Sequence, residues 1–176
     1  MGALHQVVRR ADDAAYAFEK VFLIFVHAAI FALVVVGVVL RYVFNDPLTW
    51  SEELIVALFT WMVFIAAAAA LRTHMHIRID VMAPIYANPK MKWLNGLTLL
   101  VGIAIILVAL YACVDLVAQE LVVDSPMLNV SKAWFVAAMP AGLVLMLVHI
   151  ARLWLDKGVE VVFRGEVETV IAGEQE

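Results

Sequence analysis

Charged residues are scarce in this sequence, at 16% of its 176 residues, where soluble domains carry about 25%. Cysteine is scarcer still: Cys113 is the only one, which excludes an intrachain disulfide and any metal or redox site built from several cysteines. The formal net charge of −4 is small and its charges lie between apolar runs, so we expect no nucleic-acid partner. These absences leave no basis for a soluble enzyme, and we expect neither catalysis nor a cofactor.

Apolar residues dominate instead, at 65% of the chain, and four runs are long enough to cross a membrane. They cover residues 21–40, 54–71, 94–114 and 133–151, and a spanning helix needs about 20 apolar residues. Because the runs lack strand-like alternation and a helix satisfies its own backbone groups, the sequence predicts an all-α membrane protein with four transmembrane helices. The first run exceeds the roughly 7–15 apolar residues of a cleavable signal, so we expect it to remain as an anchor.

Residues 1–20 show apolar side chains at helical spacing, with charged side chains on the opposite side. The apolar side comprises Leu4, Val7, Val8, Ala11, Ala14, Ala15 and Phe18, and the polar side comprises Arg9, Arg10, Asp12, Asp13, Glu19 and Lys20. This pattern predicts an amphipathic helix in the membrane interface, the alternative being a helix that packs on the soluble surface of a partner. We therefore divide the chain into this helix, a four-helix transmembrane domain over 21–155 and a cytoplasmic tail over 156–176.

The placement of basic residues predicts the orientation in the membrane, because lysine and arginine are retained on the cytoplasmic side. Of the 12 basic residues, Arg41 and Lys132 are the ones that fall in the first and third connections. The others lie in the terminal flanks and the second connection. Both termini are therefore expected in the cytoplasm.

The predicted spans contain few ionisable groups, although a transport site within the membrane usually requires them. His27 and His149 both fall toward the predicted cytoplasmic side and could together ligate a haem, or each could be an ordinary polar residue hydrogen-bonded at a helix contact. His74 and His76 lack the third ligand that a metal site needs.

Three features of the spans bear on helix packing. Pro140 with Gly142 interrupts the fourth span, which favours a proline kink over a discontinuous binding-site helix. The alanine run 66–70 permits close approach, either of another subunit or within this chain's own bundle. Trp61 lies mid-span, away from the membrane interface, so we expect it to pack against protein.

Residues 41–54, which join the first two spans, form the most informative stretch. Asn45-Asp46-Pro47 predicts the end of a helix and a turn, because proline disfavours helical geometry in the residue before it. Thr49 and Glu52 fit a capping box, and Ser51 is a competing N-cap. Two adjacent carboxylates point to different helix faces, so we expect one for capping and the other for a basic partner such as Arg41 or another subunit.

This stretch and several later positions carry a resemblance to a known family. They are Arg41, Phe44, Asn45, Pro47, Leu48, Trp50, Glu52, Glu53 and Leu54, then Trp61, Phe64, the alanine run, Arg72 and the segment 76–80 with His76 and Asp80, and later Ser125, Pro126, Trp134, Pro140 and Gly142. In these residues the chain resembles the small membrane subunit of tripartite ATP-independent periplasmic (TRAP) transporters. It departs at Ala66, where the family often has glycine.

The resemblance implies a secondary transporter in the inner membrane of a bacterium or archaeon, importing C4-dicarboxylates or other organic acids. A soluble periplasmic substrate-binding protein captures the substrate, and a large permease subunit holds the substrate and the coupling ion, usually sodium. The small subunit braces the permease and helps to present a docking surface. This division implies no catalytic or substrate-binding residue here.

We therefore expect the functional residues to form a subunit interface rather than a transport site. The expected interface residues are Arg41, Asn45, Trp50, Glu52, Glu53, Trp61, Arg72, His76 and Asp80. The alternative is a free-standing helical membrane protein, either a haem-bearing electron carrier or a small homo-oligomeric exporter. An exporter coupled to protons needs a titratable group within a span, and His27 is the candidate.

Overall fold

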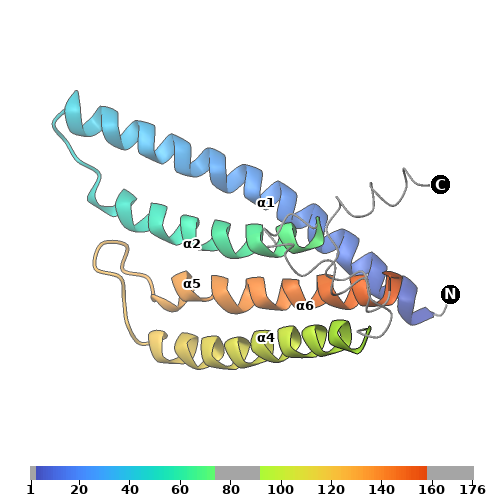
Figure 1. The fold of residues 1–176 in the computed structure, drawn as a ribbon. Helices are drawn as coiled ribbons and strands as arrows, with labels where there is room; N and C mark the ends of the chain where they lie inside the picture. Colours follow the sequence, from blue (N-terminus) through green and yellow to red (C-terminus); the bar gives the residue numbers. More distant parts are fainter. Residues whose placement is uncertain (1–2, 74–91, 158–176) are drawn as a thin grey trace.

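The computed structural model describes residues 3–73 and 92–157, which form five helical segments (Figure 1). They are α1 (Ala3–Tyr42), α2 (Thr49–Arg72), α4 (Lys92–Glu120), α5 (Ala133–Val136) and α6 (Ala138–Lys157). Four stretches are long and apolar enough to cross a membrane: His5–Tyr42, Thr49–Arg72, Leu99–Glu120 and Ala133–Leu155. The predicted all-α membrane fold with four spans is confirmed.

Helix α1 is one unbroken helix of 40 residues. At about 1.5 Å per residue it is roughly 60 Å long, about twice the thickness of the hydrocarbon core of a bilayer. The segment expected as an amphipathic helix is thus helical, but no break separates it from the first span. Its burial also differs from the pattern: Asp12 and Glu19 are buried, whereas Val7 and Phe18 are exposed. The reason is that these acids face charged groups on α2 and α6, as shown below.

The spanning helices lie side by side in the order α1, α2, α6, α4 (Figure 1). Helix α2 packs along α6, and α1 contacts both. Among the described residues, α4 contacts α5 and α6 but neither α1 nor α2. No residue of the most apolar 18-residue window of α4 is buried within the chain. Large apolar faces therefore require cover from lipid or from another protein.

The contact between α2 and α6 depends on small residues. A side chain at Gly142 would place its Cβ atom 2.7 Å from the carbonyl oxygen of Phe64, closer than atoms can approach. Ala68 on α2 and Ala138 on α6 are fully buried. The alanine run thus serves packing within this chain at Ala68, one of the two alternatives that the sequence left open.

The fourth span is interrupted at Ala137, between α5 and α6. Proline has no N–H, so Pro140 cannot donate to the carbonyl of Val136 as a helical residue would. The flanking bonds, from Ala137 N to Ala133 O at 2.9 Å and from Ala141 N to Ala137 O at 3.2 Å, are kept. The interruption is therefore the local effect of a proline, as the sequence favoured.

Candidate functional site

The structure describes seven of the nine expected interface residues: Arg41, Asn45, Trp50, Glu52 and Glu53 at one end of the helices, Trp61 in the middle and Arg72 at the other end. We call the end that carries the connections 43–48 and 121–132 the loop end (Figure 1). At this end α1 stops at Tyr42, and Asn45 adopts the left-handed conformation, with φ at 53°. The amide of Asp46 then donates to the carbonyl of Leu40 at 3.0 Å. This turn brings the last residues of α1 beside the first turn of α2.

Arg41 and Glu52 form an ion pair across that turn. Arg41 Nη2 lies 2.6 Å from Glu52 Oε1, and both side chains are more than half exposed. One of the two adjacent acids therefore pairs with Arg41, as expected. The predicted capping box is wrong, because the N-terminal cap of α2 is Leu48 and has no side-chain hydrogen bond. Ser51 is not an N-cap either, since its hydroxyl donates to the carbonyl of Leu48 at 2.7 Å.

Glu53 points away from that pair and organises the third connection. Its Oε2 atom accepts hydrogen bonds from the hydroxyl of Ser125 and from the amides of Met127, at 3.1 Å, and Leu128, at 3.0 Å. Asn129 completes the turn in the left-handed conformation, with φ at 52°. Glu53 thereby fastens the start of α2 to a loop more than 70 residues later in the chain.

An open pocket of about 370 Å³ adjoins Glu53 at the loop end. Its lining consists of Glu52, Glu53, Val56, Glu120, Ser125, Pro126, Lys132, Phe135 and Val136. Three carboxylates thus face one ammonium group. Glu120 Oε2 is shielded from solvent and has no hydrogen-bond partner among the described residues. With Arg41 paired to Glu52, one negative charge remains in excess, which makes the pocket suited to a cationic group.

Trp61 links three helices in the middle of the bundle. Its indole N–H donates to the carbonyl of Trp134 at 2.9 Å, and its ring centroid lies 5.6 Å from that of Trp134 and 6.2 Å from that of Phe22. The prediction that Trp61 packs against protein is confirmed. It also lines an apolar groove of about 580 Å³. The other lining residues are Phe18, Ile65, Leu110, Val114, Pro140, Ala141, Val144 and Leu145.

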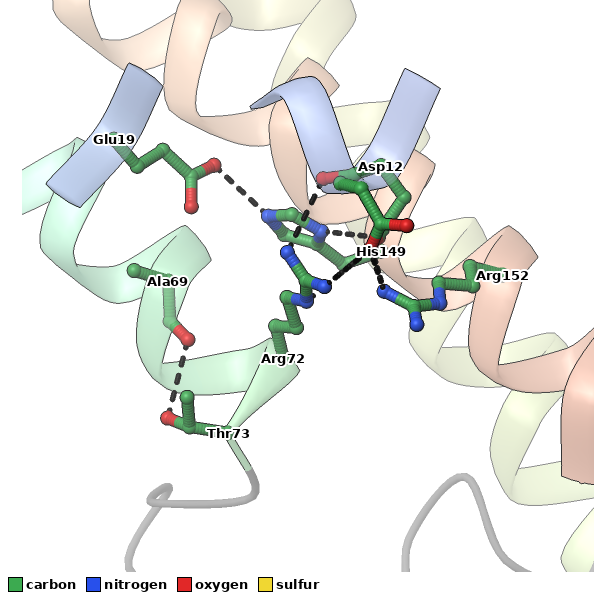
Figure 2. A network of polar contacts seen from close by, with 8 residues as sticks. Asp12, Glu19, Ala69, Arg72, Thr73, His149 and Arg152 are labelled. Atoms are coloured by element: carbon green, nitrogen blue, oxygen red, sulfur yellow. Dashed lines mark hydrogen bonds and ion pairs between the residues drawn. The ribbon is translucent and has the colours of Figure 1, made fainter. Parts of the chain in front are cut away.

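Arg72 lies at the opposite end, in a group that we call the buried ionic cluster: Asp12, Asp13, Glu19, Arg72, His149 and Arg152 (Figure 2). Its Nη2 atom lies 2.7 Å from Asp13 Oδ1 and its Nε atom 3.2 Å from Asp12 Oδ2. The guanidinium also lies over the ring of Tyr16, 4.1 Å from its centroid. Arg72 therefore joins α1 to α2 within this chain.

His149 lies at the centre of the cluster. Its Nδ1 atom is 2.6 Å from Asp12 Oδ1 and its Nε2 atom is 2.8 Å from Glu19 Oε1. With both ring nitrogens facing carboxylates, His149 has none left to bind iron. His27, the other haem candidate, contacts the carbonyl of Leu23 through Nδ1 at 3.0 Å. The structure thus favours the hydrogen-bonded alternative for His149, which removes one of the two ligands of a haem shared with His27.

The sequence pattern put Asp12 and Glu19 on the polar side of an amphipathic helix, and it did not distinguish Arg152 from the other basic residues of the flanks. One signal could have found them: Asp12 and Glu19 are seven residues apart, two helical turns, and so share a face of α1. His149 and Arg152 likewise share a face of α6. Of the other expected interface residues, Trp50 is partly exposed at 40%, and His76 and Asp80 lie outside the described residues.

Comparison with known proteins matches residues 30–157 to the family described as "Tripartite ATP-independent periplasmic transporters, DctQ component". Similar proteins include a C4-dicarboxylate TRAP transporter small permease protein of Vibrio cholerae serotype O1, 35% identical over 42% of this chain and 32% of the relative. The sialic acid TRAP transporter permease protein of Haemophilus influenzae is 29% identical over 68% of this chain and 19% of that protein. The chain therefore spans about a third and a fifth of the length of these two relatives.

A third relative matches more completely. The sialic acid TRAP transporter small permease protein of Vibrio cholerae serotype O1 is 29% identical over 73% of this chain and 74% of its own length. The residues of this chain that match the family, 30–157, include the loop end, Trp61 and His149. Asp12 and Glu19 precede the matched residues.

Proposed function

The chain belongs to the DctQ family of TRAP transporters as a small permease subunit, and on this premise we propose that it serves an importer of organic acids, such as C4-dicarboxylates, in an inner membrane. The substrate class is supported by the names of the relatives, which refer to C4-dicarboxylate and to sialic acid. The chain itself acts as a non-catalytic accessory subunit. The substrate and a coupling sodium ion are bound by a large permease subunit.

The observation that carries this proposal is the apolar groove beside Trp61. It lies on open helix faces and has almost no polar lining. In lipid such a groove is filled either by acyl chains or by a neighbouring helix that packs into it. In one relative the region that matches this chain makes up 19% of a longer permease protein. This relative supports a permanent neighbour for the chain within the membrane. We assign the groove to a helix of the large permease, which this chain braces.

The loop end is our proposed contact for the periplasmic substrate-binding protein. Arg41, Asn45, Trp50, Glu52 and Glu53 lie at this end, beside the acidic pocket. A lysine or arginine of the binding protein fits a pocket with three carboxylates. Arg72 contributes by holding α1 against α2, and we retain His76 and Asp80 as interface residues.

The orientation follows from the distribution of charge. Among the described residues the loop end carries Arg41 and Lys132, whereas the opposite end carries Arg9, Arg10, Lys20, Arg72 and Arg152. The positive-inside rule places that second end in the cytoplasm. The loop end then faces the periplasm, with both termini on the cytoplasmic side.

The experiment that tests the groove is co-purification of the tagged chain from its native membranes in mild detergent, with mass spectrometry and a visible absorption spectrum. We expect a much larger multi-span protein in near-equal amount and no haem band. Val144→Trp, which fills the groove, should reduce recovery of that protein at least about tenfold, as loss of an interface hot spot does.

Val108→Trp is the matched control, because Val108 is an exposed valine on α4 outside the groove. It should leave recovery unchanged. Equal recovery with both variants would place the permease on another face, and a stable homo-oligomer or a haem band would support the free-standing alternative.

A further inference from the structure

His149 lies between two carboxylates of α1, in a fully buried position. Asp12, Glu19 and His149 each have an exposed fraction of 0%. The imidazole is 2.6 Å from one carboxylate and 2.8 Å from the other, through different ring nitrogens (Figure 2). Both distances are those of hydrogen bonds to a charged group.

Hydrogen-bond chemistry requires one additional proton at this point. An ionised carboxylate accepts hydrogen bonds only, and a neutral imidazole has a single N–H to donate. Two contacts between one neutral imidazole and two carboxylates would therefore leave a lone pair of the ring facing a negative oxygen. Both contacts become hydrogen bonds when the three groups share one further proton.

The surrounding charges also favour one further proton. The guanidinium groups of Arg72 and Arg152 both contact Asp12 and Asp13, so two positive charges face two negative ones. Glu19 receives a hydrogen bond from His149, and its Oε2 atom is buried without a partner among the described residues. One further proton, shared between His149 and Glu19, therefore makes the cluster electrically neutral, which favours burial. The imidazole is the more basic of these two side chains, so we assign the proton to it.

We propose that Asp12, His149 and Glu19 form a buried binding site for one proton, carried by the imidazole, which fastens the N-terminal half of α1 to α6. The groups that face this site are Asp12, Asp13, Tyr16 and Glu19 on α1, Arg72 on α2 and Arg152 on α6. The site concerns the assembly of this chain and does not depend on the transported substrate.

Loss of the proton weakens the attachment of α1 to α6 at the contact between His149 and Asp12. Glu19 has no other donor among the residues described, so the remaining N–H stays on Nε2. The Nδ1 lone pair then faces Asp12, whose partners include the two arginines. The stabilising contact is therefore complete when the imidazole is protonated, and it is lost as the pH rises.

Glu19→Gln distinguishes a proton site from an ordinary polar contact. A glutamine amide can donate to Nε2 of a neutral imidazole, while the ring N–H on Nδ1 is kept for Asp12. This variant satisfies both contacts without the additional proton. His27→Gln is the control, because His27 contacts the carbonyl of Leu23 and not the cluster.

The first measurement is the thermal unfolding midpoint of the full chain in detergent between about pH 5 and about pH 10. The midpoint of the wild type should fall by about 2–4 °C as the imidazole loses its proton. The midpoint of His27→Gln should fall equally, and that of Glu19→Gln should stay level over the same interval. Parallel curves for the wild type and Glu19→Gln overturn the proposal.

The second measurement locates the proton directly by nitrogen-15 NMR of histidine-labelled protein, with the His149 signal assigned by its loss in His149→Gln. We expect both ring nitrogens protonated near neutral pH in the wild type, and one protonated nitrogen in Glu19→Gln near the alkaline limit. A neutral imidazole in the wild type near neutral pH overturns the proposal.

Discussion

The two ends of the molecule use the same kinds of charged residue in opposite ways. At the loop end the Arg41–Glu52 ion pair is more than half exposed and stands beside an open acidic pocket. In the buried ionic cluster Asp12, Glu19 and His149 are shielded from solvent, and the partners come from three helices. An exposed pair contributes little to stability, whereas a buried charge that loses its partner is costly. We infer that the buried ionic cluster holds the helices together and that the loop end is available for partners.

The largest effect on stability is expected in the buried ionic cluster. Asp12→Ala leaves Arg72 and Arg152 without one of their two carboxylate partners and removes a contact of His149. We expect a loss of about 3–5 kcal/mol in the free energy of unfolding, measured in detergent by denaturant titration. The control is Asp115→Ala, because Asp115 is exposed and bonds Gln119, and it should change stability by less than about 0.5 kcal/mol. Equal losses in the free energy of unfolding for the two variants would contradict the inference that the buried ionic cluster holds the helices together.

An intermediate and local effect is expected at Glu53. Glu53→Ala removes the acceptor of the Met127 and Leu128 amides. Hydrogen exchange at these two amides should become roughly ten- to hundredfold faster, since each loses a bond to a charged group. Glu52→Ala is the matched control, because Glu52 bonds Arg41 and not the third connection. Unchanged exchange in Glu53→Ala would mean that the loop holds its shape without α2.

The smallest effect on stability is expected at Arg41. Arg41→Ala breaks an exposed ion pair and should change the free energy of unfolding by less than about 1 kcal/mol. If the loop end contacts partners, the same variant should nevertheless weaken assembly or uptake, which radiolabelled-substrate transport in cells would measure. Normal transport and an undiminished complex in both Arg41→Ala and Glu53→Ala would place the interface elsewhere.

Several local features could be read from the sequence because their causes are local. The Asn45-Asp46-Pro47 turn ends α1 close to where proline geometry predicts, and the interruption near Pro140 follows from its missing N–H. Mid-span Trp61 was expected to contact protein, since it lies away from the membrane interface. The capping box was wrong because α2 already includes Thr49, with Leu48 as its N-cap, and Glu52 pairs with Arg41 instead.

The four spans themselves were determined by the sequence, because a helix in lipid must satisfy its own backbone and therefore needs only length and apolar composition. Which carboxylate is buried was decided by the tertiary structure. Asp12 and Glu19 look like a solvated helix face until α6 brings His149 between them, more than 120 residues later in the chain. Glu53 likewise meets Ser125 only through helix packing. The periodicity of a helix shows which residues share a face, but the partner of that face depends on contacts distant in sequence.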